Sequence, residues 1–250
     1  MFLARKKLIL NKSVFLQLAG VGAIVGIHWL CFFGGIKVAN ISITMISFSS
    51  GTFFTALIEP IVYKRKLNWN EIIIGVLIML IISIIGISEF ENSENPIAGI
   101  LLGTMAAFTS ALFSTFNGKL ILKSNAFTIS LMELIFAFVL VSIGLFVFFP
   151  IPENLLTPSS IDIWYLLLLG VVCTAFPFIA SVEVMKKLSP FSVNLAVNLE
   201  VVYAIILGYF IFGENEQMTP TFYICSAMIF LLIIFNEILK RKRKKKLMTG

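Results

Sequence analysis

Three carboxylates of this chain lie inside long apolar segments, where a charged side chain is costly. They are Glu59, Glu133 and Glu200. Insertion scales place the cost of a charged residue at the centre of a membrane span at about 2.5 kcal/mol or more, so such residues tend to face a helix bundle or a water-filled cavity. Glu200 lies nearest to the middle of its segment. It is therefore the leading candidate for a proton-coupling group or for a group that binds a substrate amine.

The other two carboxylates are weaker candidates. Glu133 lies about two helical turns into its segment and is kept as a coupling candidate. Glu59 lies closer to the end of its segment, where its side chain can reach Lys64 or Arg65 by snorkelling. We therefore expect Glu59 to have a structural role.

Two asparagines lie close to Glu200 in the same segment. Asn194 and Asn198 are four residues apart, so they share one face of a helix. Glu200 stands about 200° round that helix from Asn198, at about 100° per residue. The asparagine pair and Glu200 therefore cannot line the same wall. Either the pair faces a cavity and Glu200 contacts a neighbouring helix, or the reverse holds.

His28 and Trp29 are the next candidates, in an earlier apolar segment. A lone histidine beside aromatic residues is more often a packed hydrogen-bond donor between helices than a proton relay, although histidine suits both roles. A tryptophan near the end of a span is commonly an interfacial anchor. Both residues are kept as candidates to line a cavity.

A polar stripe and one proline mark two further segments. Ser110, Ser114 and Asn117 follow helical spacing, and small polar residues in that pattern favour close helix packing over ligand binding. Pro177 is expected to kink its helix and to free a carbonyl group.

The elements that position these residues are predicted to be membrane-spanning helices. The 250 residues are 59% hydrophobic and 13% charged, with a mean hydropathy of +1.01, whereas soluble domains carry about a quarter charged residues. A span needs about 20 apolar residues. Eight segments approach that length, and we predict an all-α integral membrane protein with eight transmembrane helices at 14–36, 41–63, 71–89, 97–117, 127–149, 163–184, 189–212 and 219–239.

Basic residues alternate between the gaps that separate these segments. Eighteen of the nineteen lysines and arginines fall in every second gap or at the two ends, and only Lys37 lies on the other side. The positive-inside rule makes the basic gaps cytoplasmic. We therefore predict a multi-pass protein of the cell membrane (inner or plasma membrane), with the lipid bilayer as a partner and a cytoplasmic C-terminus that carries the basic tail 240–250.

Several classes of function are not expected. The basic residues form short clusters beside the spans, which does not suit a nucleic-acid interface. The three cysteines lie in apolar segments without CxxC spacing, and no metal site or cofactor is expected. A membrane-embedded enzyme would need a cluster of His, Asp or Ser at one depth, and one histidine with no Asp inside a span argues against it.

The chain carries an internal repeat of opposite orientation. Residues 14–67 align with 164–217 at a constant offset of 150, which pairs Gly20 with Gly170 and Lys37 with Lys187. The Lys37 hairpin is predicted outside and the Lys187 hairpin inside, as in the inverted repeats of secondary transporters. We predict a partial first repeat of three spans at 1–90 and a second repeat of five at 97–239. By this register two spans would precede Met1, and the chain is expected to be truncated there.

Several motifs resemble those of the EamA-type permeases of the drug/metabolite transporter superfamily. They are "HWLCFFGGIKVANIS", "GILLGTMAAFTSALFSTFNGKLI", "TFFTALIEPIVYKRKLNWNEIIIGVLIML" and "KKLSPFSVNL" running into "NLEVVYAIILGYFIFGENE". The resemblance implies a bundle of ten helices in two inverted repeats, of which this chain lacks the first two helices. It also places the helix of His28 and Trp29 against the cavity.

The resemblance implies a secondary transporter, a permease or exporter, of a small organic metabolite such as an amino acid, working by alternating access without a cofactor. Two alternatives stay open. One is a truncated or vestigial membrane protein that does not transport, and the other is a lipid-carrier flippase of the same fold. A homodimer is compatible with the sequence.

Overall fold

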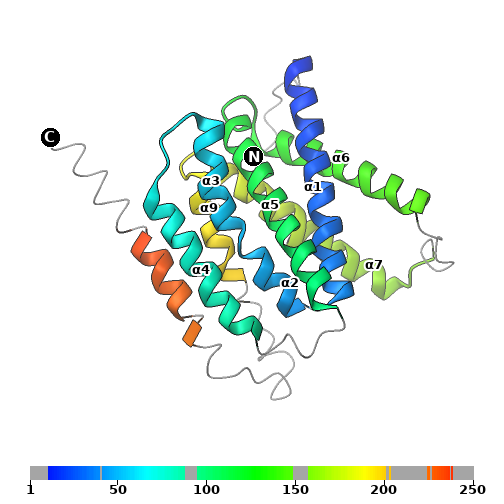
Figure 1. Ribbon diagram of the computed structural model, residues 1–250. Helices are drawn as coiled ribbons and strands as arrows, with labels where there is room; N and C mark the ends of the chain where they lie inside the picture. Colours follow the sequence, from blue (N-terminus) through cyan, green and yellow to red (C-terminus); the bar gives the residue numbers. More distant parts are fainter. Residues whose placement is uncertain are drawn as a thin grey trace.

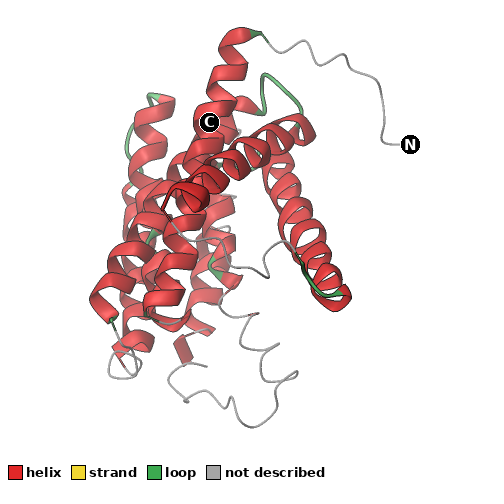
Figure 2. Cartoon of the chain, turned by 90° about the vertical axis from the view of Figure 1, so that its right-hand side faces the viewer, coloured by secondary structure: helices red, strands yellow, loops and turns green. Residues whose placement is uncertain are grey.

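The computed structural model describes residues 11–39, 41–87, 95–148, 157–200, 203, 224–225, 227–236 and 238. All regular structure in these residues is helical and none of them forms a strand (Figure 2). The helices are α1 (Lys12–Val38), α2 (Ile41–Phe48), α3 (Gly51–Tyr63), α4 (Trp69–Ile87), α5 (Pro96–Leu120), α6 (Ala126–Phe148), α7 (Ser160–Leu167), the π-helical stretch η2 (Leu168–Ala175), α8 (Phe176–Val184) and α9 (Pro190–Val197).

The lengths and composition of these helices confirm an all-helical, multi-pass membrane protein. Four helical stretches are long and apolar enough to cross a bilayer: Lys12–Val38, Pro96–Leu120, Ala126–Val147 and Ser160–Val184. Gly51–Tyr63, Trp69–Ile81 and Ala227–Asn236 are shorter apolar helices. The total of eight spans stays a prediction, because much of the segments 189–212 and 219–239 lies outside the described residues.

The predicted segment 41–63 differs from expectation, because a turn at Ser49 and Ser50 divides it into α2 and α3. Two serine hydroxyls donate to backbone carbonyls here: Ser47 Oγ to the oxygen of Ile43 at 2.9 Å and Ser50 Oγ to that of Ser47 at 2.6 Å. Such local bonds compete with regular helix bonding and bend helices. A run of apolar and hydroxyl residues therefore gives two short helices where one was expected.

Helix α5 lies at the centre of the bundle, against α1, α2, α3 and α9 (Figure 1). Small side chains make these contacts possible: a Cβ atom built on Gly103 would lie 2.8 Å from the carbonyl oxygen of Thr44 in α2. Buried small residues recur along the whole helix, at Gly99, Gly103, Ala106, Ala107, Ser110, Ala111, Ser114 and Gly118. Small residues let helix backbones approach closely in membranes. Close packing is therefore found along α5, as expected for its stripe, while two residues of that stripe, Ser114 and Asn117, also bond to side chains of α9 and α6.

Two clusters of buried apolar side chains lie beside α5. One joins α1, α5, α6, α8 and α9, with Leu18 and Ile129 fully buried within it. The other joins α3, α4, α9 and residues 225–233, around Ile78 and Phe191. In contrast, none of the residues 160–175 in α7 and η2 is buried. The helices nearest α5 therefore form a packed bundle, and α7 with η2 lies at its edge.

Two glycines of α1, Gly22 and Gly26, lie close against α6, and the first of them allows a matched test. A Cβ atom on Gly22 would lie 2.6 Å from Cβ of Phe136 and 2.8 Å from the carbonyl oxygen of Glu133. We expect Gly22→Ala to reduce the free energy of unfolding by about 1–3 kcal/mol, the usual cost of overpacking. Thermal unfolding of the purified protein in lipid nanodiscs measures the change.

Gly20→Ala on the same helix is the control. Within the described residues, nothing lies within 4 Å of a Cβ built on Gly20. This variant should gain up to about 1 kcal/mol from better helix propensity. Equal stability of the two variants would contradict the close α1–α6 contact.

Candidate functional site

Five neutral polar residues meet where α3, α5 and α9 cross. Asn194 Nδ2 donates hydrogen bonds to Thr55 Oγ1 at 2.5 Å and to Ser114 Oγ at 2.9 Å. Asn198 Nδ2 donates to Thr52 Oγ1 at 2.6 Å, and Thr52 Oγ1 donates to the carbonyl oxygen of Asn194 at 3.4 Å. All five side chains are buried. We call this group the asparagine cluster.

Local sequence explains why these residues meet. Ser189 caps α9, since its hydroxyl accepts the N–H of Ser192, and Pro190 occupies the first turn, where it suits a helix start. The α9 helix then places Asn194 and Asn198 on one face. The cluster offers amide and hydroxyl groups that can donate or accept hydrogen bonds without carrying charge. Such groups can bind the polar atoms of a small solute.

Glu200 does not join this cluster. It follows Asn198 in a short helical continuation and is exposed, whereas both asparagines face neighbouring helices. Of the two arrangements that the helical geometry left open, the contacts of the asparagine pair with neighbouring helices match the second, and a cavity beside Glu200 stays a prediction. The next two residues, 201 and 202, lie outside the described residues.

His28 is a packed donor between α1 and α5. Its Nδ1 lies 2.8 Å from the carbonyl oxygen of Ala106, which requires an N–H on that nitrogen. Its ring stacks on Phe32 at a centroid distance of 6.0 Å and meets Phe113 edge-on at 5.4 Å. Trp29, the next residue, is half-buried. His28 thus bonds to α5 and packs among aromatic rings, and a cavity-lining part for His28 and Trp29 stays a prediction.

Among the carboxylates that the structure describes, Glu133 is the most deeply buried. Its residue is fully buried in α6, and Oε2 accepts a hydrogen bond from Asn117 Nδ2 of α5 at 2.9 Å. Asn117 is itself 1% exposed. The sequence placed these two residues in separate groups, and spacing alone gave no signal that they meet.

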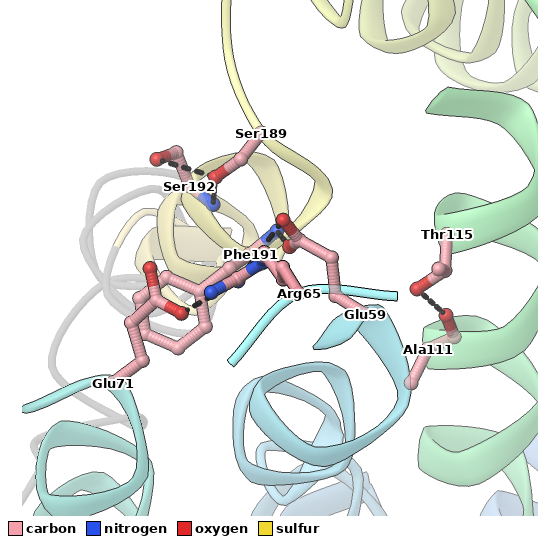
Figure 3. Close-up of polar contacts among 8 residues, drawn as sticks. All are labelled: Glu59, Arg65, Glu71, Ala111, Thr115, Ser189, Phe191 and Ser192. Atoms are coloured by element: carbon pink, nitrogen blue, oxygen red, sulfur yellow. Dashed lines mark hydrogen bonds and ion pairs between the residues drawn. The ribbon is translucent and has the colours of Figure 1, made fainter. Parts of the chain in front are cut away.

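Glu59 takes part in a network of charges at the ends of α3, α4 and α9 (Figure 3). Arg65 bridges Glu59 Oε1 at 3.1 Å and Glu71 Oε2 at 2.8 Å. The second oxygen of Glu59 accepts the backbone N–H of Phe191 at 2.9 Å. That N–H belongs to the first turn of α9, where donors lack partners within the helix. Arg65, one of the two cations that the sequence placed within reach of Glu59, is thus its partner, which supports the expected structural role.

The bend after α3 aims Arg65 at these carboxylates. Lys64 ends α3 in the left-handed conformation, with φ 53° and ψ 40°. Burial of Arg65 lowers its pKa, but hydrogen bonding to Glu71 and the charges of Glu71 and Glu59 more than offset this, so its pKa lies above the ordinary value. The sequence missed Glu71 and the Phe191 N–H, because only the folded chain brings α4 and α9 to this place.

The described residues hold no group of three His, Cys, Asp or Glu side chains that could bind a metal ion. Cys31, Cys173 and Cys225 are free thiols. The chemistry of the described interior is thus hydrogen bonding by neutral groups, together with one ion network and one isolated carboxyl.

The comparison with known families decides the class of the protein. The sequence profile of the EamA-like transporter family matches residues 97–238. This chain belongs to the EamA-like transporter family. The resemblance seen in the sequence motifs is thereby confirmed, and the EamA chain is a transporter-type protein of the drug/metabolite transporter superfamily.

A solved structure shares the fold of this EamA protein. That structure, described only as "Crystal structure of protein", superposes with a TM-score of 0.72 at 14% identity, and the match covers 92% of this chain and 80% of the other. At that identity the match shows the fold alone. No curated protein matches the sequence.

The ion network allows a test of its contribution to stability. We expect Arg65→Leu to reduce the free energy of unfolding by about 2–3 kcal/mol, because it leaves two buried carboxylates without their cation. This is below the ~3–5 kcal/mol of a fully buried pair, since the Arg65 side chain is 32% exposed. Chemical or thermal unfolding in nanodiscs gives the value.

The matched control is Lys186→Leu, which breaks the exposed pair of Lys186 with Glu183. Exposed pairs contribute about 0–1 kcal/mol, so this EamA variant should be nearly as stable as the parent. A loss for Arg65→Leu no larger than that for Lys186→Leu would show that the network contributes little.

Proposed function

We propose that this EamA protein is a secondary transporter of a small organic metabolite, such as an amino acid, and that it works by alternating access. The asparagine cluster carries the proposal. Thr52 and Thr55 come from the predicted first repeat, whereas Ser114, Asn194 and Asn198 come from the predicted second repeat. Transporters built from inverted repeats bind their solutes where the repeats meet, near the middle of the bilayer. A cluster of neutral donors and acceptors at that junction suits a polar solute.

Two further observations support the predicted repeat arrangement. The family match at 97–238 nearly coincides with the predicted second repeat at 97–239. The alternating charges place the Lys37 and Lys187 hairpins on opposite sides, as inverted repeats require. The same charges support eight spans, a cytoplasmic C-terminus and a place in the cell membrane.

Each candidate side chain has a proposed part in transport. Asn194 and Asn198 exchange hydrogen bonds with the solute. Glu200 is exposed and so stays accessible to a solute amine or a proton. His28 and Trp29 shape the wall beside α5, where the His28 bond to Ala106 holds α1 in place.

A lipid carrier is the second candidate solute, because one apolar groove suits it. The groove has a volume of about 600 Å³ and is lined by α4 and by side chains from residues 228–235 and 238, with Leu80, Ile84 and Phe235 among them. A lipid tail fits such a lining through burial of apolar surface. The experiment below therefore tests a labelled polyprenyl phosphate beside the water-soluble solutes.

The proposed function is tested by flux in proteoliposomes with a panel of radiolabelled amino acids. Thr52→Val removes the hydroxyl that accepts from Asn198 while keeping the side-chain shape. We expect the rate of amino-acid flux to fall about tenfold, which corresponds to the ~1.4 kcal/mol of a lost buried hydrogen bond.

Thr115→Val is the matched control, because Thr115 is equally buried but donates only within its own helix, to the Ala111 carbonyl at 2.6 Å (Figure 3). Its flux should stay near that of the parent. Flux of the polyprenyl phosphate alone would favour the lipid carrier. Absence of flux for every solute would favour a protein that does not transport.

Glu200 has a separate prediction. Glu200→Gln keeps the shape of the side chain and removes its charge, so amino-acid flux should drop by roughly tenfold or more if the carboxylate binds a substrate amine. The measurement is initial rate against solute concentration, at equal protein level in the vesicles. Unchanged kinetics would remove Glu200 from the mechanism.

A further inference from the structure

The side chains of Glu133 and Asn117 are joined by one hydrogen bond, and each also has an oxygen atom without a hydrogen-bond partner among the described residues. Asn117 Nδ2 donates to Glu133 Oε2 at 2.9 Å. Within the part of the chain that the structure describes, Glu133 Oε1 and Asn117 Oδ1 have no hydrogen-bond partner. Both residues are shielded from solvent, at 0% and 1% exposure. Each unsatisfied buried acceptor is unfavourable, because it has lost its hydrogen bonds to water.

The surrounding helices leave the pair no room to open. The α1 backbone lies against α6 at Gly22, where an added Cβ would come 3.0 Å from Cα of Glu133 and 2.8 Å from its carbonyl oxygen. One turn earlier on α6, Ser130 is also fully buried, and its hydroxyl has no partner among the described residues. The carboxyl is therefore enclosed by backbone and by neutral side chains.

No described cation contacts this carboxyl. On α1, His28 bonds to the Ala106 carbonyl, and Cys31 lies two turns or more toward the other end of the helix from Gly22. On α5, Lys119 Nζ donates to the Val62 carbonyl. The remaining charged groups on the helices around α6 are exposed: Lys12 and Lys37 near the ends of α1, Lys123 bonded to Gln17 after α5, and Glu183 of α8 paired with Lys186. An ionised carboxylate without a cation is strongly unfavourable in such a site.

We propose that Glu133 and Asn117 form a proton-binding site, in which Glu133 holds a proton on Oε1 and releases it during the transport cycle. A proton there turns an unsatisfied acceptor into a donor, and Asn117 Oδ1 is the acceptor of that donor. One bound proton changes the charge of Glu133 from −1 to 0 and satisfies both leftover oxygens. Amide and carboxylic acid are then joined by two hydrogen bonds.

Release of the proton requires movement of the helices. Water reaches Oε1 only when α1 and α6 separate at Gly22 or when α5 withdraws Asn117. Proton loss is thus tied to one conformation of the bundle, which is the property that a coupling site needs. This step rests on the proposed transport function, whereas the protonated state of Glu133 does not.

The protonated state is tested by infrared spectroscopy of the full chain in lipid vesicles at neutral pH. A protonated carboxyl gives a C=O band distinct from carboxylate bands. We expect this band to disappear in Glu133→Gln and to shift to higher frequency in Asn117→Ala, which removes the bond to Oε2. Glu200→Gln, as the control, should leave the band in place. Identical spectra for the parent and Glu133→Gln would overturn the assignment.

The melting temperatures of two Glu133 variants give a second test of the protonated state, which remains informative if one variant folds poorly. The amide of Glu133→Gln donates to Asn117 Oδ1 as the protonated acid does, so its melting temperature should equal or exceed that of the parent. Glu133→Leu leaves Asn117 without either bond, and its melting temperature should fall. A Glu133→Gln variant as unstable as Glu133→Leu would show that the ionised form is the native one.

Coupling is tested in proteoliposomes under an imposed pH gradient, with a pH-sensitive dye trapped inside. A pH gradient should drive solute flux in the parent protein, and the flux of Glu133→Gln should be the same with and without the gradient. Flux driven by a sodium gradient, or equal response in both proteins, would overturn proton coupling at Glu133. Absence of any flux would refute the proposed transport function and the coupling step, and the infrared band would still decide the protonation of Glu133.

Discussion

The interior of this bundle has to supply its own hydrogen-bond partners, because the lipid around it has none to offer. Every buried polar contact described above follows from that constraint. His28 donates to a backbone carbonyl, Asn194 and Asn198 donate to hydroxyls, and Glu59 accepts an N–H at the start of α9. Two of these contacts, those of His28 with Ala106 and of Asn194 with Ser114, reach α5, which carries small residues on the faces that its neighbours approach. Buried polar groups therefore find hydrogen-bond partners in this bundle only where the helices pack closely.

The two polar regions of the bundle have different physical characters. The charge network of Glu59, Arg65 and Glu71 holds the ends of three helices with partners that attract one another strongly. The asparagine cluster uses neutral groups that lose little when one partner is exchanged for another of the same kind. The asparagine cluster can therefore rearrange around a solute, whereas the charge network is suited to hold the ends of helices in place. The left-handed residue Lys64 makes the first region possible by turning the chain back at the end of α3.

Local sequence features predicted much of this arrangement. Apolar length and composition predicted the helices, spacing placed Asn194 and Asn198 on one face, and proximity along the chain paired Glu59 with Arg65. Contacts between distant segments could not be predicted in this way. Asn117 meets Glu133 because a turn brings α5 and α6 together at one depth, and Thr52 meets Asn198 across 146 positions of sequence. The division at Ser49 and Ser50 was missed because hydropathy does not register hydroxyls that bond to their own backbone.

The π-helical stretch η2 at the edge of the bundle affects how the chain responds to the loss of a residue there. Pro177 follows it closely, and within it Thr174 Oγ1 donates to the Leu169 carbonyl five positions earlier, at 2.8 Å. A π-helical stretch has wider turns than an α-helix, so it contains one more residue over the same length along the axis. Loss of a single residue between Leu168 and Ala175 would therefore let the stretch wind as an α-helix, and α7 would turn by much less than the ~100° that loss of a residue from a regular α-helix causes, because the wider turns already accommodate that residue. The wider turns of η2 thus allow the chain to gain or lose one residue there with little change in the direction of the faces of α7.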